Sequence, residues 1–168
     1  AMRRFALLGF LSLSVCATAA QEHSDPLTVT HVHGNIYMLQ GPGGNIALSL
    51  GDDGTLLIDS KFADLANQIR TVIDSLQGGE IRYILNTHFH RDHVDGNHAL
   101  GQGAPIIAHH NVRQRLLARP RIDQRYVAPI PRPGWPTLTF DYTLSIHFNG
   151  EEIRAVHFDH GHTDGDIA

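Results

Sequence analysis

Four side chains that can bind a metal stand within residues 88–93 (HFHRDH), directly after an apolar, strand-like run (IRYILNT). Imidazole and carboxylate groups suit zinc and similar divalent ions. In an extended segment, residues two apart point the same way, so His88 and His90 can bind one metal. Asp92 and His93 then follow a turn and can face a second metal. The spacing therefore predicts a metal site at the end of a strand.

A later segment, residues 159–164 (DHGHTD), places His162 in a glycine-containing loop. Together with the run at 88–93, this segment resembles the pattern of the metallo-β-lactamase superfamily. Two segments near the N-terminus also fit that family: GGN at 43–45, before one expected strand, and LLID at 56–59, at the end of the next. Thr87, just before the run at 88–93, and DGN at 95–97, just after it, fit as well. The resemblance covers about residues 30–168.

This resemblance implies an α/β (α+β) fold, the αββα sandwich of the superfamily, with the N-terminal half and only the start of the second half in this chain. It implies that His88, His90 and His162 bind a first zinc ion. Asp92 and His93 are expected to bind a second zinc. Asp92 is also expected to orient the attacking hydroxide, as the catalytic residue. Two such ions can share a hydroxide and polarise a carbonyl or phosphoryl oxygen.

Two neighbours of these residues need an interpretation of their own. In the superfamily, Asp59 is a supporting residue near the site rather than a usual ligand. The residues alone equally allow a strand-end acid that caps the following helix. His160 is interpreted as a neighbour of His162 without a metal role.

The end of the chain departs from the superfamily pattern. Its members normally add a later histidine for the second metal, and many add a bridging aspartate. Neither can be assigned, because the chain ends six residues after His162. Asp164 and Asp166 stand too close to His162 to match. We therefore expect an incomplete domain over residues 21–168, in which the second zinc lacks a ligand and is weakly held.

The first twenty residues predict a secretory signal peptide, residues 1–20. Two arginines precede an apolar run that is too short to span a bilayer, and Ala17-Thr18-Ala19 offers a cleavage site. The protein is expected to be secreted or in a bacterial periplasm, with no stable membrane association after cleavage; an uncleaved membrane anchor is the alternative. Cleavage would remove Cys16, the only cysteine, which excludes a disulfide and a cysteine nucleophile or ligand.

Size and charge narrow the class of partner. The 168 residues are 42% hydrophobic and carry a formal charge of −4, which predicts one globular domain without the basic surface that nucleic-acid binding needs. The expected partner is a small-molecule substrate. Nothing in the sequence predicts an oligomeric state.

Hydrophobic periodicity predicts the elements that carry these residues. Strands are expected over residues 29–32, 36–39, 45–50, 55–58, 81–86, 105–108, 143–148 and 151–158. Helices are expected over residues 63–77, 94–100 and 111–118, the last with Asn111 as its N-cap. The order strand, helix, strand at 55–58, 63–77 and 81–86 predicts a βαβ unit. Asn149-Gly150 predicts a hairpin turn, and the proline-rich residues 119–136 are expected to form a loop.

Three functions remain open at this point. The main interpretation is a secreted zinc-dependent hydrolase that uses a metal-bound hydroxide on a β-lactam, lactone, thioester or other ester. The second is a non-catalytic periplasmic metal-binding protein, since thirteen histidines permit metal storage. The third is an inactive, truncated hydrolase. Asp92 separates the first two, because a store built from imidazoles needs no carboxylate between its ligands.

Overall fold

A computed structural model describes residue 23 and residues 25–118 and 129–168. The strands are β1 (Thr28–His33), β2 (Ile36–Gln40), β3 (Ile46–Gly51), β4 (Gly54–Ile58), β5 (Ile81–Asn86), β6 (Ile106–His109), β7 (Leu138–Phe140), β8 (Thr143–Phe148) and β9 (Glu151–Val156). The α-helices are α1 (Ala66–Ser75), α2 (Arg91–Val94), α3 (Asn97–Leu100) and α4 (His110–Leu117). Two short 3₁₀ helices are η1 (Ala63–Leu65) and η2 (Arg132–Gly134).

Seven strands form one sheet in the order of the sequence, β1 to β7. Neighbours from β1 to β4 are antiparallel, whereas β4, β5, β6 and β7 run parallel to one another. Helix α1 makes the crossover from β4 to β5, so the expected βαβ unit is confirmed. Parallel strands end at the same edge of a sheet, and the loops after β4 and β5 therefore lie next to each other.

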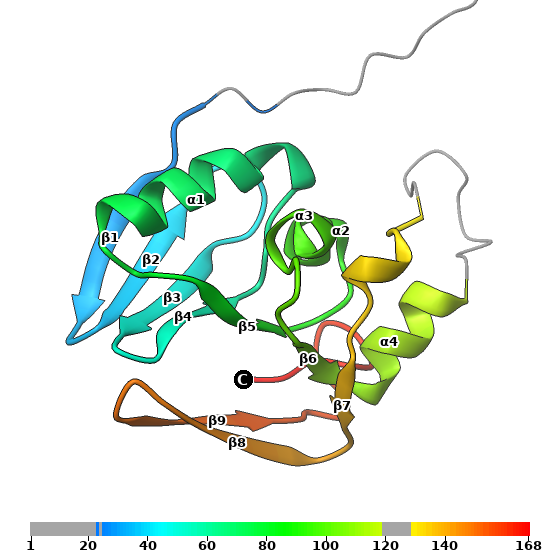
Figure 1. Cartoon of the computed structure of the whole chain (residues 1–168). Coiled ribbons are helices and arrows are strands. Elements are labelled where there is room, and N and C mark those ends of the chain that lie inside the picture. Colours follow the sequence, from blue (N-terminus) through cyan, green and yellow to red (C-terminus); the bar gives the residue numbers. More distant parts are fainter. Residues whose placement is uncertain (1–22, 24, 119–128) are drawn as a thin grey trace, which may run out of the picture.

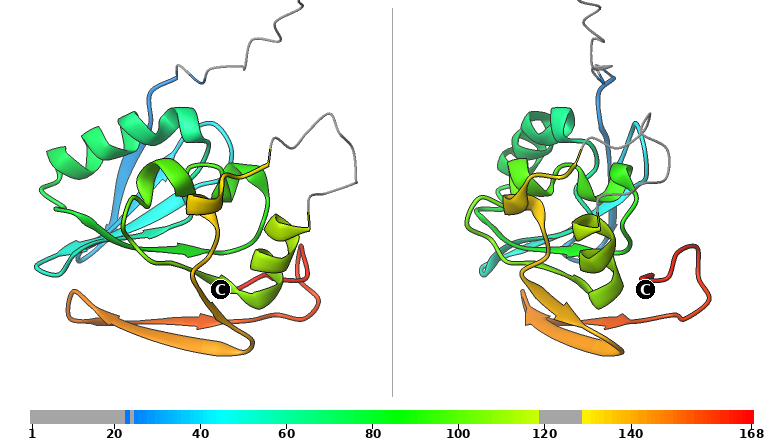
Figure 2. Two further views of the ribbon diagram at one scale, coloured as in Figure 1. Left: turned by 45° about the vertical axis from the view of Figure 1, so that its right-hand side comes forward. Right: turned by 90° about the vertical axis from the view of Figure 1, so that its right-hand side faces the viewer.

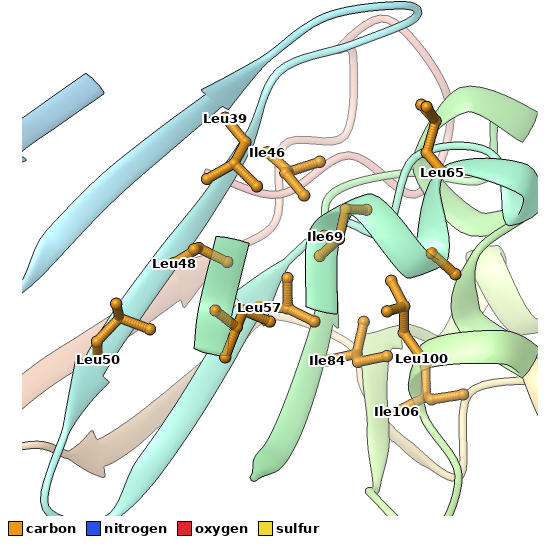
Figure 3. Close-up of a cluster of buried hydrophobic side chains, with 12 residues drawn as sticks. Leu39, Ile46, Leu48, Leu50, Leu57, Leu65, Ile69, Ile84, Leu100 and Ile106 are labelled. Atoms are coloured by element: carbon orange, nitrogen blue, oxygen red, sulfur yellow. The ribbon is translucent and has the colours of Figure 1, made fainter. Parts of the chain in front are cut away.

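One face of this sheet packs against α1 (Figure 1). Apolar residues recur in α1 at helical spacing, and Ile69 and Ile73 point from it into the sheet. They meet Leu48, Leu57 and Ile84 from the strands in one fully or nearly fully buried cluster (Figure 3). Burying each such side chain contributes about 1.5–3 kcal/mol. This cluster holds the strands whose ends carry the site.

The β8–β9 hairpin covers the opposite face, as the views in Figure 2 show. Leu85 and Ile107 from the large sheet contact Ala155 of the hairpin and Ile167 in a second buried cluster. The hairpin turns at Asn149 and Gly150, whose φ angles of 54° and 77° are those of a type I′ turn. The expected hairpin is confirmed, and it leads directly into the loop that carries His162.

Two expectations about the helices are wrong. The single helix expected over residues 94–100 is split into α2 and α3, because the Gly96 N–H donates to the Lys61 carbonyl oxygen at 2.9 Å and leaves the helical ladder. The N-cap of α4 is His109, whose ring accepts from the Asn111 N–H; the Asn111 side chain instead donates to the Asp164 carbonyl at 2.6 Å.

Strand β7 was not expected from the sequence. It falls inside no alternating run, and it forms because Ile107, Ala108 and His109 of β6 offer it a parallel edge. The predicted signal peptide, and residues 119–128 of the predicted loop, lie outside the described residues. None of the helices within 25–118 and 129–168 has the length and hydrophobicity that a membrane span requires.

Candidate metal centre

The six-residue run 88–93 begins just beyond the end of β5. The strand ends at Asn86 and the chain bends at residues 87–89, so the continuous extended segment expected for His88 and His90 is wrong, although His90 itself has extended backbone angles. The backbone bends through residues 87–89 and reaches His90, which stands at the N-cap position of α2. The bend still brings the two rings together, with centroids 4.9 Å apart and planes nearly perpendicular.

His162 joins this pair from a distant part of the chain. The loop after β9 places His162 Nε2 3.0 Å from His90 Nδ1, and the ring centroids of His88 and His162 lie 5.3 Å apart. One ligand atom from each of the three histidines lies within 4.8 Å of the others. Three imidazole nitrogens that converge at this distance suit a tetrahedral zinc ion with one position left for water or substrate.

Hydrogen bonds select the ring nitrogen that His88 can offer. Asp59 accepts from the Thr87 N–H at 2.7 Å and from the Thr87 hydroxyl at 2.6 Å. Since the hydroxyl gives its proton to Asp59, it accepts from His88 Nδ1 across 3.0 Å. The free lone pair of His88 is therefore on Nε2. Partners of this kind orient ligands and fix their tautomers in metal sites.

The protonation of two of these histidines also favours metal binding. Burial lowers the pKa of His88 to about 4, with a further contribution from the charge of His93. Burial, followed by the charge of His162, also lowers the pKa of His90. A metal binds only the neutral ring. Both side chains are thus held in the form that can act as ligands near neutral pH.

Asp92 and His93 lie in the first turn of α2, beside the three histidines. The His93 ring is 4.0 Å from the His88 ring between centroids, and its Nε2 is 3.5 Å from Asp92 Oδ2. Its Nδ1 lies 2.7 Å from Asp59 Oδ2. Burial alone would lower the pKa of His93, but the hydrogen bond and charge of Asp59 outweigh it and raise this pKa. Asp92 and His93 are therefore neighbours that could share a second ion.

The carboxylate of Asp59 thus serves both halves of this centre, through Thr87 to His88 and directly to His93. The alternative interpretation of Asp59 as a helix cap is wrong. The N–H of Ala63, which opens η1, is held at 3.1 Å by Asp95 Oδ2 instead. Asp95 follows the histidine run in the sequence, but nothing in its spacing connects it with a helix thirty residues earlier in the chain.

The loop that presents His162 is held on the C-terminal side of this histidine by two aspartates. Asp166 accepts from the Thr163 N–H at 2.8 Å and from the Thr163 hydroxyl, and Asp164 pairs with Arg115 of α4 at 2.6 Å. His160 is exposed and is not part of the three-histidine group among the described residues. Sequence reasoning missed Arg115, because its partner is 49 residues away in the chain.

Comparison with known proteins identifies the fold. A family model described as the metallo-β-lactamase superfamily matches residues 29–168. The chain belongs to this superfamily. The seven-stranded sheet with helices on one face and a hairpin on the other is the corresponding part of the metallo-β-lactamase fold. No match was found among curated proteins.

Solved metallo-β-lactamases share this arrangement. The enzyme of Cronobacter sakazakii with a HARLDQ motif is 26% identical, with a TM-score of 0.72 over 86% of this chain and 57% of that one. BJP-1, a subclass B3 enzyme of Bradyrhizobium japonicum, is 20% identical, with a TM-score of 0.73 over 88% and 57%. MEM-A1, a subclass B3 enzyme from a soil metagenome, is 24% identical, with a TM-score of 0.70 over 85% and 56%. The chain therefore spans 56–57% of the length of these relatives.

Gly44 lies against both residues of the second half of the centre. Its backbone N–H donates to Asp92 Oδ2 at 2.9 Å, and a Cβ there would overlap Cε1 and Nε2 of His93. We expect Gly44→Ala to displace the His93 ring and to lower stability by about 1–3 kcal/mol, the usual effect of overpacking. Urea unfolding and metal titration measure the two effects.

Gly103→Ala is the matched control. Its added Cβ meets no atom within 4 Å, and its strain comes only from a φ of 89°. This control is expected to lose stability and to bind metal as the wild type does. If Gly44→Ala also binds metal like the wild type, the close contact between residue 44 and His93 does not matter for the site.

Proposed function

We propose that this chain is the zinc-binding part of a metal-dependent hydrolase. The observation that carries the proposal is the convergence of His88, His90 and His162 within 4.8 Å. The carboxylate of Asp92 lies 3.5 Å from His93, whose ring is 4.0 Å from that of His88. In the proposal, the three histidines bind a first zinc ion, and Asp92 and His93 contribute to a second. Membership of the superfamily supports a hydrolase that acts on a small molecule.

Each residue has a separate task in this proposal. Bound zinc supplies a Lewis acid and lowers the pKa of water from 15.7 to roughly 7. Asp59 and Thr87 keep His88 in the tautomer that binds through Nε2. Asp92, whose Oδ2 is held by the Gly44 N–H, accepts a hydrogen bond from the attacking water and orients it toward the substrate. No protein nucleophile is required.

The substrate class stays open between a β-lactam, a lactone, a thioester and another ester. The similar structures are metallo-β-lactamases, and this favours a β-lactam as the first substrate to test. The proposal includes export by the segment 1–20 to the periplasm or the medium. N-terminal sequencing of the protein recovered outside the cytoplasm tests it, with a start at Gln21 as the expected result.

A metal store without catalysis is the second candidate function. Thirteen histidines would support it, but Asp92 would then have no task. A store is expected to bind zinc and to hydrolyse none of the substrates, whereas a hydrolase loses activity with its metal. Metal-dependent hydrolysis is therefore the property that distinguishes the two functions.

The test uses the complete product of the gene. We expect it to bind zinc, to hydrolyse at least one of nitrocefin, a homoserine lactone, an acyl thioester and an aryl ester, to lose this activity on chelation and to regain it with zinc. Metal content and initial rates are measured on the same samples. Zinc binding with no hydrolysis of any of the four would favour the store, and the absence of zinc binding would reject both functions.

A further inference from the structure

Lys61 is the only lysine of the chain, and its side chain is fully buried beside the candidate centre. Buried ammonium groups are unfavourable unless they are paired and hydrogen-bonded. The backbone of Lys61 also has a φ of 54°, in the left-handed region that side chains other than glycine, asparagine and aspartate rarely adopt. Two unfavourable features at one residue indicate that its ammonium group has a specific task.

The ammonium group binds the loop between β2 and β3. Lys61 Nζ donates to the carbonyl oxygens of Gly44 and, at 3.3 Å, Pro42. Gly44 is also the residue whose N–H donates to Asp92 Oδ2. A single peptide segment thus receives a hydrogen bond from Lys61 and gives one to Asp92. The side chain of Lys61 cannot reach a substrate itself, since it has no exposed surface.

The backbone of Lys61 contacts the segment that follows Asp92 in the chain. Its carbonyl oxygen accepts from the Gly96 N–H at 2.9 Å, just beyond the helical turn that carries Asp92. The neighbouring Ser60 N–H donates to the carbonyl oxygen of His93 at 2.9 Å. Burial lowers the pKa of Lys61, whereas the charge of Asp92 raises it, so the two charges interact. Lys61 therefore contacts both segments between which Asp92 is placed.

We propose that Lys61 is a positioning residue for the second metal: its ammonium group fixes the loop at Pro42–Gly44, and the Gly44 N–H then holds Asp92 Oδ2 beside His93 Nε2. This inference rests on the proposed function, because it takes Asp92 and His93 as ligands of a second ion. It assigns a role to a lysine that touches neither metal nor substrate. In the proposed function the first metal is bound by His88, His90 and His162, whose rings, in the part of the chain that the structure describes, receive no hydrogen bond from the loop at Pro42–Gly44.

A Co²⁺ titration followed by absorption spectroscopy tests the proposal on the complete gene product. We expect Lys61→Met to weaken the second binding step by about tenfold or more, as loss of an outer partner of a metal ligand usually does. The first step is expected to stay within about threefold of the wild type. Arg82→Met, which removes an exposed cation at the other end of β5, is the matched control and is expected to leave both steps unchanged.

Rescue separates positioning from a general loss of structure. Lys61→Cys is made together with Cys16→Ser, and the unfolded protein is alkylated with 2-bromoethylamine, which restores an ammonium group of nearly the same length. The alkylated protein is expected to recover the second binding step after refolding. Recovery of stability without recovery of that step would overturn the proposal.

A measurement on the wild type decides the matter even if these variants do not fold. Protein labelled with ¹⁵N-lysine gives one Nζ resonance for the residues of this chain, since Lys61 is the only lysine. We expect that resonance to shift when the second Co²⁺ equivalent binds and to change less with the first. The inference about Lys61 is overturned, and the proposed function is not, if the Nζ resonance does not shift with the second Co²⁺ equivalent. The same holds if the Lys61→Met protein binds both equivalents as the wild type does. A wild type that binds no metal and hydrolyses nothing overturns the proposed function itself.

Discussion

Replacing Asp92 by asparagine is expected to lower turnover by about 10²–10⁴-fold, the range for loss of a positioned acid–base group. The amide has nearly the same shape and can still accept the Gly44 N–H, so the loop next to it should stay in place. What is lost is the negative charge that would hold the second metal and orient the attacking water. Metal content and initial rates of the complete gene product, with and without added zinc, measure the effect.

The control for Asp92→Asn is Asp74→Asn, which makes the same chemical change on the exposed face of α1. It is expected to keep wild-type turnover. Asp92→Asn should retain the first metal and a cooperative thermal transition, because the three histidines are untouched. An Asp92→Asn enzyme that works at the wild-type rate would show that this carboxylate does not orient the nucleophile.

Replacing both His88 and His162 by alanine is expected to abolish tight zinc binding at the first site. Sharing about 10–16 kcal/mol of apparent zinc-binding free energy among four ligands gives roughly 2.5–4 kcal/mol for each one. A single loss should thus weaken binding by about 10²–10³-fold, and the double change should leave the first site empty at micromolar zinc. Isothermal titration or a competing chelator measures this.

His160→Ala is the control for the histidine variants, because His160 is only two residues from His162 and lies outside the three-histidine group of the described residues. Its zinc affinity should equal that of the wild type. Unchanged zinc stoichiometry in the double variant would refute the ligand assignment. If His160→Ala released zinc instead, the loop after β9 would present a different ring from the one proposed.

Both predictions concern a centre in which His88 and His93 are linked through one acid, Asp59. Asp59 directly follows β4 with a φ of 65°, in the left-handed region that aspartate adopts more readily than most residues, and its carboxylate bonds Thr87 and His93. Its carboxylate sets the tautomer of His88 through the Thr87 hydroxyl and accepts a hydrogen bond from His93 Nδ1 directly. The chemistry of the centre thus depends on the edge where the parallel strands β4 and β5 end together.

Much of this molecule could be predicted from local pattern. Local sequence predicts three elements: the strand at 81–86, the helix that contains Ile69 and Ile73, and the turn at Asn149-Gly150. In each of them the residues that decide the conformation lie within a few positions of one another. The spacing in the run at 88–93 similarly indicates metal binding before any fold is known. Those signals are short-range, and the structure has the elements that they predict.

Other features depend on partners that local pattern does not contain. The break after α2 exists because Gly96 bonds Lys61, and β7 exists because β6 offers it an edge. The tautomer of His88 depends on Asp59, 29 residues earlier, and the meeting of His90 with His162 spans 72 residues. The residue types that could bind a metal, and the strand they follow, can be recognised from local pattern. Which of these side chains meet is a property of the folded chain, because hydrogen bonds and buried contacts between distant segments set the final distances.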